Sequence, residues 1–234
     1  MGYARDVVDS VQFLANRSRD AFEAGWRRET AQRSPYQAWN DRHEAIFVHV
    51  PKAAGQSVKA ALGLDDDPRF GHISAEGLRH ADPDRYARYT SFAVVRHPVD
   101  RLRSAFQYLT STTPYAHDRA WARRHLSGIH SFPDFVERLN SPLFRARVMP
   151  WIHFRPQAHF VADTGGSLIV DRIFQLETLD TSFAEFCREI GVHRPLGTAN
   201  ASSPQGRDGD LDAGQRRIVQ GLYQEDFDLL GFAP

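Results

Sequence analysis

A loop of small residues with one lysine and one serine stands between a short apolar run and a predicted helix. The loop is Pro51–Ser57, with the sequence P-K-A-A-G-Q-S. Its backbone N–H groups and the positive end of the helix form a cradle for phosphate or sulfate oxygens. Lys52 adds a compact charge on a flexible stem, and Ser57 adds a hydroxyl donor. The small residues that let an anion approach the main chain are Ala53, Ala54 and Gly55.

The alternative interpretation of this loop is a generic turn between a strand and a helix. Its lysine precedes the glycine, so it is not the G-x-x-x-x-G-K-[ST] motif of nucleotide-binding P-loops. The chain has 29 Lys and Arg residues, of which only Lys52 and Lys59 are lysines. In so arginine-rich a chain, each lysine is a candidate for a role that a planar guanidinium would perform badly.

A second segment with anion-binding residue types is Ser91–Phe106, S-F-A-V-V-R-H-P-V-D-R-L-R-S-A-F. Arg96 ends a predicted strand, and Ser104 stands in the helix that follows. A guanidinium offers a fork of donors suited to a phosphate, and the hydroxyl can bind the same group. The alternative is that Arg96 pairs with Asp100 while Ser104 only packs. Two such segments on neighbouring strands predict a doubly phosphorylated ligand.

Composition limits the class of protein. Apolar residues make up 41% of the 234 residues, charged residues 25%, and the formal net charge is zero. This excludes a disordered chain, a rod, and a protein that binds nucleic acid through bulk charge. Cys187 is the only cysteine, no apolar stretch approaches the ~20 residues of a membrane span, and charges interrupt Met1–Phe22. We therefore expect a cytoplasmic protein without a membrane span.

The apolar pattern predicts an α/β fold with a central parallel sheet. Strands are expected over 45–50, 91–95 and 172–176. Helices are expected over 57–62, 102–109, 118–126, 133–139, 183–190 and 211–230, with a helical N-terminal arm over 1–40 and a loop over 197–209. Ser182 and Glu185 have the spacing of a capping box. Because parallel sheets bind ligands at the carboxyl ends of their strands, both motifs should meet at one edge.

Together the two motifs resemble those of sulfotransferases that use 3′-phosphoadenosine 5′-phosphosulfate (PAPS). I-F-V-H-V-P-K-A-A-G-Q-S looks like the 5′-phosphosulfate loop, and F-A-V-V-R-H-P-V-D-R-L-R-S-A-F looks like the 3′-phosphate segment. The resemblance continues through Arg155–Phe160, Asp171–Leu179 and Tyr223–Phe232, and is greatest to the carbohydrate (glycosaminoglycan-type) sulfotransferases. It implies a P-loop-like three-layer α/β fold, with a catalytic core over 45–232 in one domain spanning 1–234.

The resemblance also implies roles for individual residues. The implied donor-binding residues are Lys52, Ala53, Ala54, Gly55, Gln56, Ser57, Arg96 and Ser104. Threonine is common in the family where Ala53 and Gln56 stand, so one hydroxyl contact is absent or is replaced by the Gln56 amide. His97 stands where Asn or Asp is more frequent. Glu177 resembles a family glutamate at a strand end, where anchoring a loop is favoured over chemistry.

A histidine between the two motifs is the expected general base. Gly71 and His72, in F-G-H-I-S, are similar to the place where carbohydrate sulfotransferases carry their catalytic histidine. Transfer to a hydroxyl needs a base, and histidine titrates in the useful range. With 11 histidines in the chain, an exposed or structural role is the alternative. No histidine and cysteine spacing indicates a zinc site, so no metal is expected.

An arginine-rich segment, Arg119–Arg155, is the candidate acceptor surface. It contains seven arginines against Asp134 and Glu137, together with Trp121 and Trp151. Such a surface could hold an acidic saccharide or another anionic or sugar-containing acceptor. A solvated helix face is the equally favoured alternative.

The expected activity is therefore sulfuryl transfer from PAPS to an acceptor hydroxyl of a saccharide or of a glycosylated or small natural product. Lys52 would stabilise the leaving group and His72 would take the proton. The alternatives are a nucleotide-dependent P-loop kinase and a PAPS- or glycan-binding protein without turnover. Arg96 and Ser104 disfavour the kinase, because they serve no purpose without a 3′-phosphate. The presence of both Lys52 and His72 disfavours the inactive protein.

Overall fold

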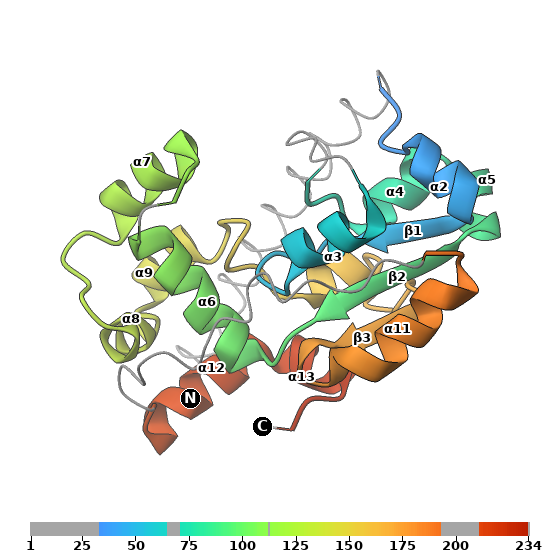
Figure 1. The fold of residues 1–234 in the computed structure, drawn as a ribbon. Helices are drawn as coiled ribbons and strands as arrows, with labels where there is room; N and C mark the ends of the chain where they lie inside the picture. The colour runs from blue at the N-terminus through green and yellow to red at the C-terminus, as the bar shows by residue number, and fades with distance from the viewer. Residues whose placement is uncertain (1–32, 65–70, 112, 193–210, 234) are drawn as a thin grey trace.

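The centre of the molecule is a parallel sheet in the order β1-β2-β3 (Figure 1). The computed structural model describes residues 33–64, 71–111, 113–192 and 211–233. The strands are β1 (Ala45–Val48), β2 (Thr90–Val95) and β3 (Arg172–Gln175). On the central strand, Phe92 pairs with Phe47 on one side and with Arg172 on the other. The strands thus end at one edge of the sheet, and the expected α/β fold with a parallel sheet is confirmed.

Helices cover the sheet and extend beyond it. In chain order they are α2 Ala38–His43, α3 Gly55–Leu62, α4 Ala75–Ala81, α5 Pro83–Arg88, α6 Pro98–Thr110, α7 Ala116–His125, α8 Phe132–Arg138, α9 Pro142–Val148, α10 Ala158–Val161, α11 Leu179–Glu189, α12 Ala213–Leu222 and α13 Gln224–Leu230, with a short 3-10 helix at Leu176–Thr178. Among the helices that the structure describes, none has the length and apolar character of a membrane-spanning segment.

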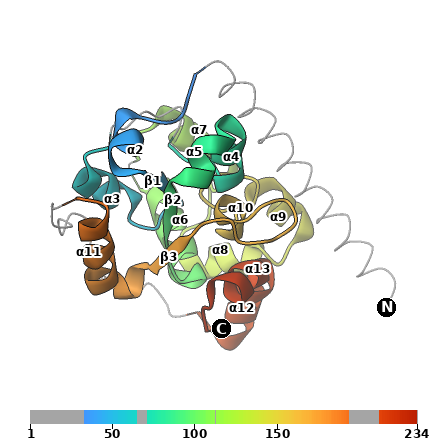
Figure 2. The same cartoon turned by 90° about the vertical axis from the view of Figure 1, so that its right-hand side faces the viewer.

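Both faces of the sheet are buried, which explains why consecutive residues of its strands are apolar. Ile46 and Val95 face a cluster supplied by α4, α5, α10 and α13. Phe92 and Val94 face the opposite cluster, supplied by α2, α3 and α11. Figure 2 shows these two groups of helices on opposite sides of the strands. The result is the three-layer arrangement that the resemblance implied.

A third apolar cluster lies past the carboxyl end of β2. It joins α6 to α7, α8, α9 and α12, with Phe135 and Phe154 fully buried at its centre. The two rings stack with their centroids 5.1 Å apart. Replacing either ring by alanine would cost about 3–5 kcal/mol. This cluster places α6 and α7 beside the edge of the sheet where ligands are expected (Figure 1).

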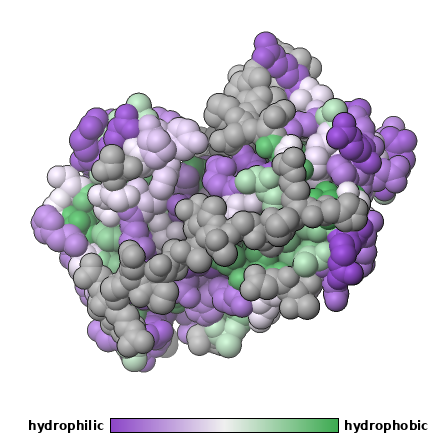
Figure 3. All heavy atoms as spheres, viewed as in Figure 1, coloured by the Kyte–Doolittle hydropathy of each residue, from purple (hydrophilic) through white to green (hydrophobic). Residues whose placement is uncertain are grey.

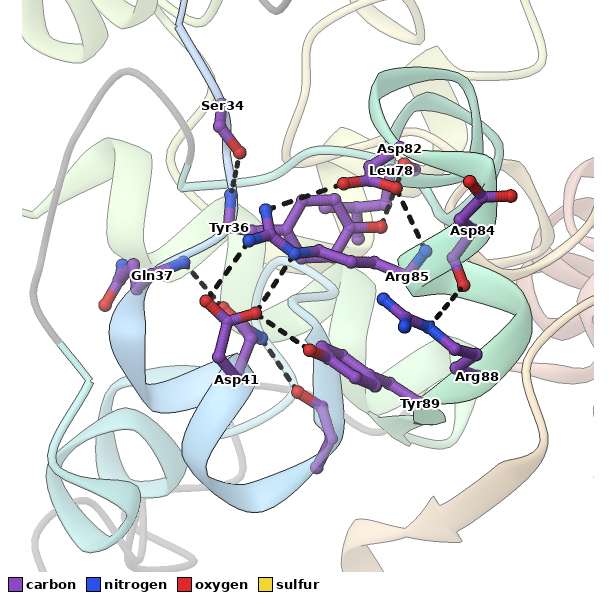
Figure 4. A network of polar contacts seen from close by, with 12 residues as sticks. Ser34, Tyr36, Gln37, Asp41, Leu78, Asp82, Asp84, Arg85, Arg88 and Tyr89 are labelled. Atoms are coloured by element: carbon purple, nitrogen blue, oxygen red, sulfur yellow. Dashed lines mark hydrogen bonds and ion pairs between the residues drawn. The ribbon is translucent and has the colours of Figure 1, made fainter.

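A polar network joins the segment ahead of β1 to α4 and α5 (Figure 4). The Tyr36 hydroxyl donates to the Leu78 carbonyl at 3.0 Å. The Asp41 carboxylate accepts from the Tyr89 hydroxyl at 2.8 Å and pairs with the Arg85 guanidinium at 3.0 Å. Exposed ion pairs contribute only about 0–1 kcal/mol each. The network therefore fixes the position of α4 beside β1 more than it stabilises the fold.

The expected capping box at Ser182 is wrong. The helix α11 begins earlier, at Leu179, with Thr178 as its N-cap, so Ser182 lies inside the helix. Leu179 is buried in the cluster against the sheet. Burial of this additional apolar residue therefore outweighs the local capping preference of the serine.

The expected single helix over 211–230 is two helices. Tyr223 has φ −117° and ψ 25° between α12 and α13. Its side chain is fully buried and its hydroxyl donates to the Phe154 carbonyl at 2.7 Å, so the break places the ring in the core. The expected arm over 1–40 lies outside the described residues up to residue 32, and 33–37 are not helical. The expected loop over 197–209 also lies outside the described residues.

Candidate functional site

The turn after β1 has a strained main chain at two non-glycine residues. Lys52 has φ 67° and Ala54 has φ 58°, both in the left-handed region that side chains disfavour. Ala54 is the N-cap of α3, and alanine offers no side-chain acceptor to the first N–H groups of the helix. These groups need another acceptor, which an anion can supply. Around them, Ala53 and Ser57 are buried and Gln56 is exposed.

Gly55 is required by a close approach. A side chain here would overlap the imidazole of His49, the residue that follows β1. Burial, with further contributions from His72 and Lys59, holds the pKa of His49 well below its usual value. The His49 ring is therefore neutral and forms a wall behind the loop, and only glycine leaves room for it.

Lys52 lies on an aromatic ring in a partly buried position. Its Nζ is 4.0 Å from the centroid of the Tyr108 ring. Burial and then repulsion from Arg96 lower the pKa of Lys52 to about 8, although Asp118 acts in the opposite direction. Ser104 stands four residues before Tyr108 on α6, and residues at this spacing share a helix face. The serine is thus on the side of α6 that faces Lys52.

Arg96, at the end of β2, is held by its main chain. The Gln157 side chain, fully buried, accepts from the Arg96 N–H at 2.9 Å and donates to its carbonyl at 2.8 Å. The next residue, His97, donates its N–H to Glu177 Oε1 at 2.8 Å. Burial lowers the pKa of the Arg96 guanidinium. With Lys52, two partly buried cations therefore converge from adjacent strand ends, an arrangement that favours a multiply charged anion.

The neutral His72 ring is held in the tautomer that leaves Nε2 free of hydrogen, as a general base requires. Its Nδ1 lies 3.1 Å from the main-chain oxygen of His49. A carbonyl only accepts hydrogen bonds, so Nδ1 carries the hydrogen and Nε2 carries the lone pair. Burial lowers the pKa of His72 to about 4, although the hydrogen bond to His49 acts in the opposite direction. The imidazole is neutral at pH 7, and Nε2 can accept a proton.

A buried carboxylate connects the Lys52 side of the site with the His72 side. Asp118 Oδ2 accepts from the Tyr108 hydroxyl at 2.8 Å and lies 3.3 Å from His153 Nε2. The His153 ring meets the His72 ring edge-on, with centroids 6.1 Å apart. Burial favours protonation of Asp118, but its partners His153 and Tyr108 prevail and lower its pKa. The two expected catalytic side chains are thus linked through residues that the sequence motifs did not indicate.

Arg101 fastens α6 to the same site. Its side chain is fully buried, and it donates to the carbonyl oxygens of Pro51 at 3.5 Å and of His153 at 3.3 Å. It also donates to the carbonyl oxygen of Arg155. These bonds join the loop after β1 to the segment that carries His153. Arg101 is therefore a structural cation, and the sequence motifs did not identify it either.

Some arginines of the arginine-rich segment bind oxygens of the protein, and others carry their charge at the surface. The arginines that bind carbonyl or carboxylate oxygens of the protein are Arg119, Arg138 and Arg155. Arg124 and Arg147 are exposed, and after burial their charges lower the pKa of His125. We call these two arginines the basic patch. It lies on α7 and α9, where α7 presents a hydrophilic surface (Figure 3), and the Trp121 and Trp151 rings stack nearby with centroids 4.6 Å apart.

Side chains that could bind a metal do not cluster in the part of the chain that the structure describes. Within those residues, no group of three or more His, Cys, Asp and Glu side chains could hold a metal ion. Cys187 is buried against the sheet, and burial raises its pKa to about 11.

Comparison with known proteins identifies one family. A family model described as the sulfotransferase family matches residues 38–233. The matched region includes the three strands that the structure describes and both strand-end motifs. No curated protein and no solved structure matches the chain.

Proposed function

The chain belongs to the sulfotransferase family, and on that premise we propose that it transfers the sulfuryl group of PAPS to an acceptor hydroxyl. The observation that carries this proposal is the convergence of Lys52 and Arg96 past the ends of β1 and β2, where the Arg96 charge contributes to lowering the pKa of Lys52. A donor with phosphate groups at both ends of its ribose would neutralise both cations. The resemblance of the motifs to those of carbohydrate sulfotransferases supports a sugar or a glycosylated molecule as acceptor.

The residues present fit such a donor. The N–H groups at the start of α3, together with Lys52 and Ser57, would hold the 5′-phosphosulfate, and Gln56 stands beside them on the exposed side. Arg96 and Ser104 would hold the 3′-phosphate. The Gln157 amide fixes the Arg96 main chain, so the point from which this side chain extends is set before the ligand arrives.

When bound, PAPS supplies a sulfuryl group whose bond to the bridging phosphate oxygen breaks as a bond to the acceptor oxygen forms. Lys52 places its positive charge where negative charge develops on the leaving oxygen. His72 accepts the acceptor's hydroxyl proton at Nε2, while its Nδ1–H stays on the His49 carbonyl. Charge on the leaving group and the proton of the nucleophile are thus handled by two different side chains.

Ligand preference tests this proposal directly. Adenosine 3′,5′-bisphosphate at 100 times its dissociation constant should stabilise the protein by about 2.7 kcal/mol, and AMP or ATP at the same concentration by much less. Arg96→Gln should remove the preference, because Arg96 is proposed to contact the 3′-phosphate. Thermal unfolding measures both effects. Arg172→Gln is the matched control, because Arg172 begins β3 at the other edge of the sheet, and it should keep the preference. Equal shifts with AMP and the bisphosphate in the wild type would favour the kinase instead.

The basic patch is proposed to bind an acidic acceptor. The Michaelis constant for a uronic-acid oligosaccharide should then rise with salt, because exposed charges are screened. Arg124→Gln and Arg147→Gln should each raise it about two- to fivefold, whereas Arg217→Gln on α12 should leave it unchanged. Initial rates at several salt concentrations measure this. A salt-independent constant, or activity only on neutral phenols, would contradict an acidic acceptor.

A further inference from the structure

We propose that Asp118 is a positioning residue of the transfer site, which supports the charge of Lys52 and orients the rings beside Lys52 and His72 through its two hydrogen-bond partners. The partners are Tyr108, which lies against Lys52, and His153, which lies against His72. The inference rests on the proposed function, and it adds a residue from α7 to a site whose sequence motifs lie in and around β1 and β2.

Asp118 is a buried carboxylate in the first turn of α7, and its hydrogen bonds are directed toward the site. Only 1% of the residue is exposed, and both partners bind the same oxygen, Oδ2. Its Oδ1 lies 3.7 Å from Nε2 of His117, an exposed neighbour on the same helix, and accepts no hydrogen bond among the described residues. A buried carboxylate is costly unless cations and donors surround it. Its influence on Lys52 favours a contribution to the site rather than to the core.

The charge of Asp118 matters because Lys52 is otherwise in an unfavourable place. Lys52 faces the Tyr108 ring from α6, Arg96 from the end of β2 and Asp118 from α7. Burial and Arg96 both oppose its positive charge, whereas the Asp118 carboxylate and the face of the Tyr108 ring support it. With a pKa of about 8, the amine is near the point at which it loses its proton under ordinary conditions. Removing the carboxylate therefore moves Lys52 toward the neutral form, which cannot stabilise a leaving oxygen.

The scarcity of lysine makes a direct measurement possible. In protein labelled with ¹⁵N-lysine, the Nζ signals of Lys52 and Lys59 can be followed against pH, and Lys52→Ala identifies the first by its loss. Asp118→Asn should lower the pKa of Lys52 by about one pH unit and shift the basic limb of kcat/KM downward equally. Asp228→Asn makes the same chemical change at an exposed position on α13 and should shift neither.

Tyr108→Phe separates the hydrogen bond from the charge. It keeps the ring under Lys52 and the carboxylate in place, so the pKa of Lys52 should stay near the wild-type value, while kcat falls about two- to tenfold because one orienting bond is lost. If Asp118→Asn folds, as judged by a cooperative thermal unfolding transition, and leaves the pKa of Lys52 unchanged, the proposal is overturned. If it does not fold, Tyr108→Phe decides, and wild-type turnover in that variant overturns the proposal.

Failure of the proposed function has a different signature. The NMR titration needs no substrate and no turnover. A lowered pKa of Lys52 in Asp118→Asn, together with no sulfuryl transfer by the wild type to any acceptor, would support the link between Asp118 and Lys52. That result would contradict the proposed reaction but not the effect of Asp118 on Lys52.

Discussion

Lys52→Ala is expected to lower kcat by about 10²–10³, the range lost when a group that stabilises developing negative charge is removed. Lys52 carries the compact charge at the end of β1, and its Nζ is held over the Tyr108 ring. Binding of adenosine 3′,5′-bisphosphate should weaken far less, because Arg96 and the N-terminus of α3 remain. Steady-state rates and calorimetric binding of the bisphosphate measure the two effects separately.

Lys52→Arg should recover little of the lost turnover. The main chain of Lys52 is fixed with φ 67°, and Arg96 already opposes its charge. A larger planar guanidinium would have to fit between Arg96 and the Tyr108 ring, and its charge is spread over three nitrogens. Arg217→Ala, which removes an exposed cation from α12, is the control and should keep wild-type kcat. Full activity in Lys52→Arg would mean that any positive charge suffices.

His72→Ala is expected to lower kcat by about 10²–10⁴, the usual contribution of a positioned base. Bisphosphate binding should stay nearly unchanged, because His72 is proposed to act on the acceptor and not on the donor. His80→Ala removes an exposed histidine from α4 and should keep wild-type rates. Loss of bisphosphate binding in His72→Ala would assign the residue to the architecture of the site. Undiminished turnover would direct the search for the base to His49 and Glu177.

The pH dependence follows from the same two groups. A general base acts when it is unprotonated, and burial lowers the pKa of His72 to about 4, so kcat/KM should rise as pH increases through about 4. Lys52 acts when it is protonated, so kcat/KM should fall as pH increases through about 8. His72→Ala should lose the lower limb and keep the upper one. If the lower limb of the wild type lies near 6.5, the ordinary histidine value, burial does not control the pKa of the catalytic base.

Local pattern was sufficient for the strands and for the residues at their ends. The runs A-I-F-V and S-F-A-V-V are apolar throughout because helices cover both faces of the sheet, and this property is visible in single segments. Arg96 follows the second run directly and Lys52 stands four residues after the first, so the parallel topology brings both to one edge. Where local and tertiary preferences competed, as at Ser182, local pattern gave the wrong helix start.

Only the tertiary structure reveals which residues hold the site residues in place. The clamp on Arg96 comes from Gln157, 61 residues away in the chain, and His153 meets Asp118 across 35 residues. Gly55 has an ordinary place at a helix start, and its necessity becomes apparent only when the His49 ring is seen to occupy the space of a side chain. Among the supporting residues, Tyr108 alone has a local signal, because it stands four residues after Ser104 and therefore shares its helix face.

The sequence by itself therefore determined which charged and hydroxyl groups stand at the ends of the strands, since periodicity and motif spacing are properties of adjacent residues. The tertiary structure decided how those groups ionise. Burial sets the direction of the pKa shifts of Lys52 and His72, and the carboxylate of Asp118 acts on both. Desolvation and charge coupling depend on atoms brought together by packing, and no local pattern in the chain records their distance.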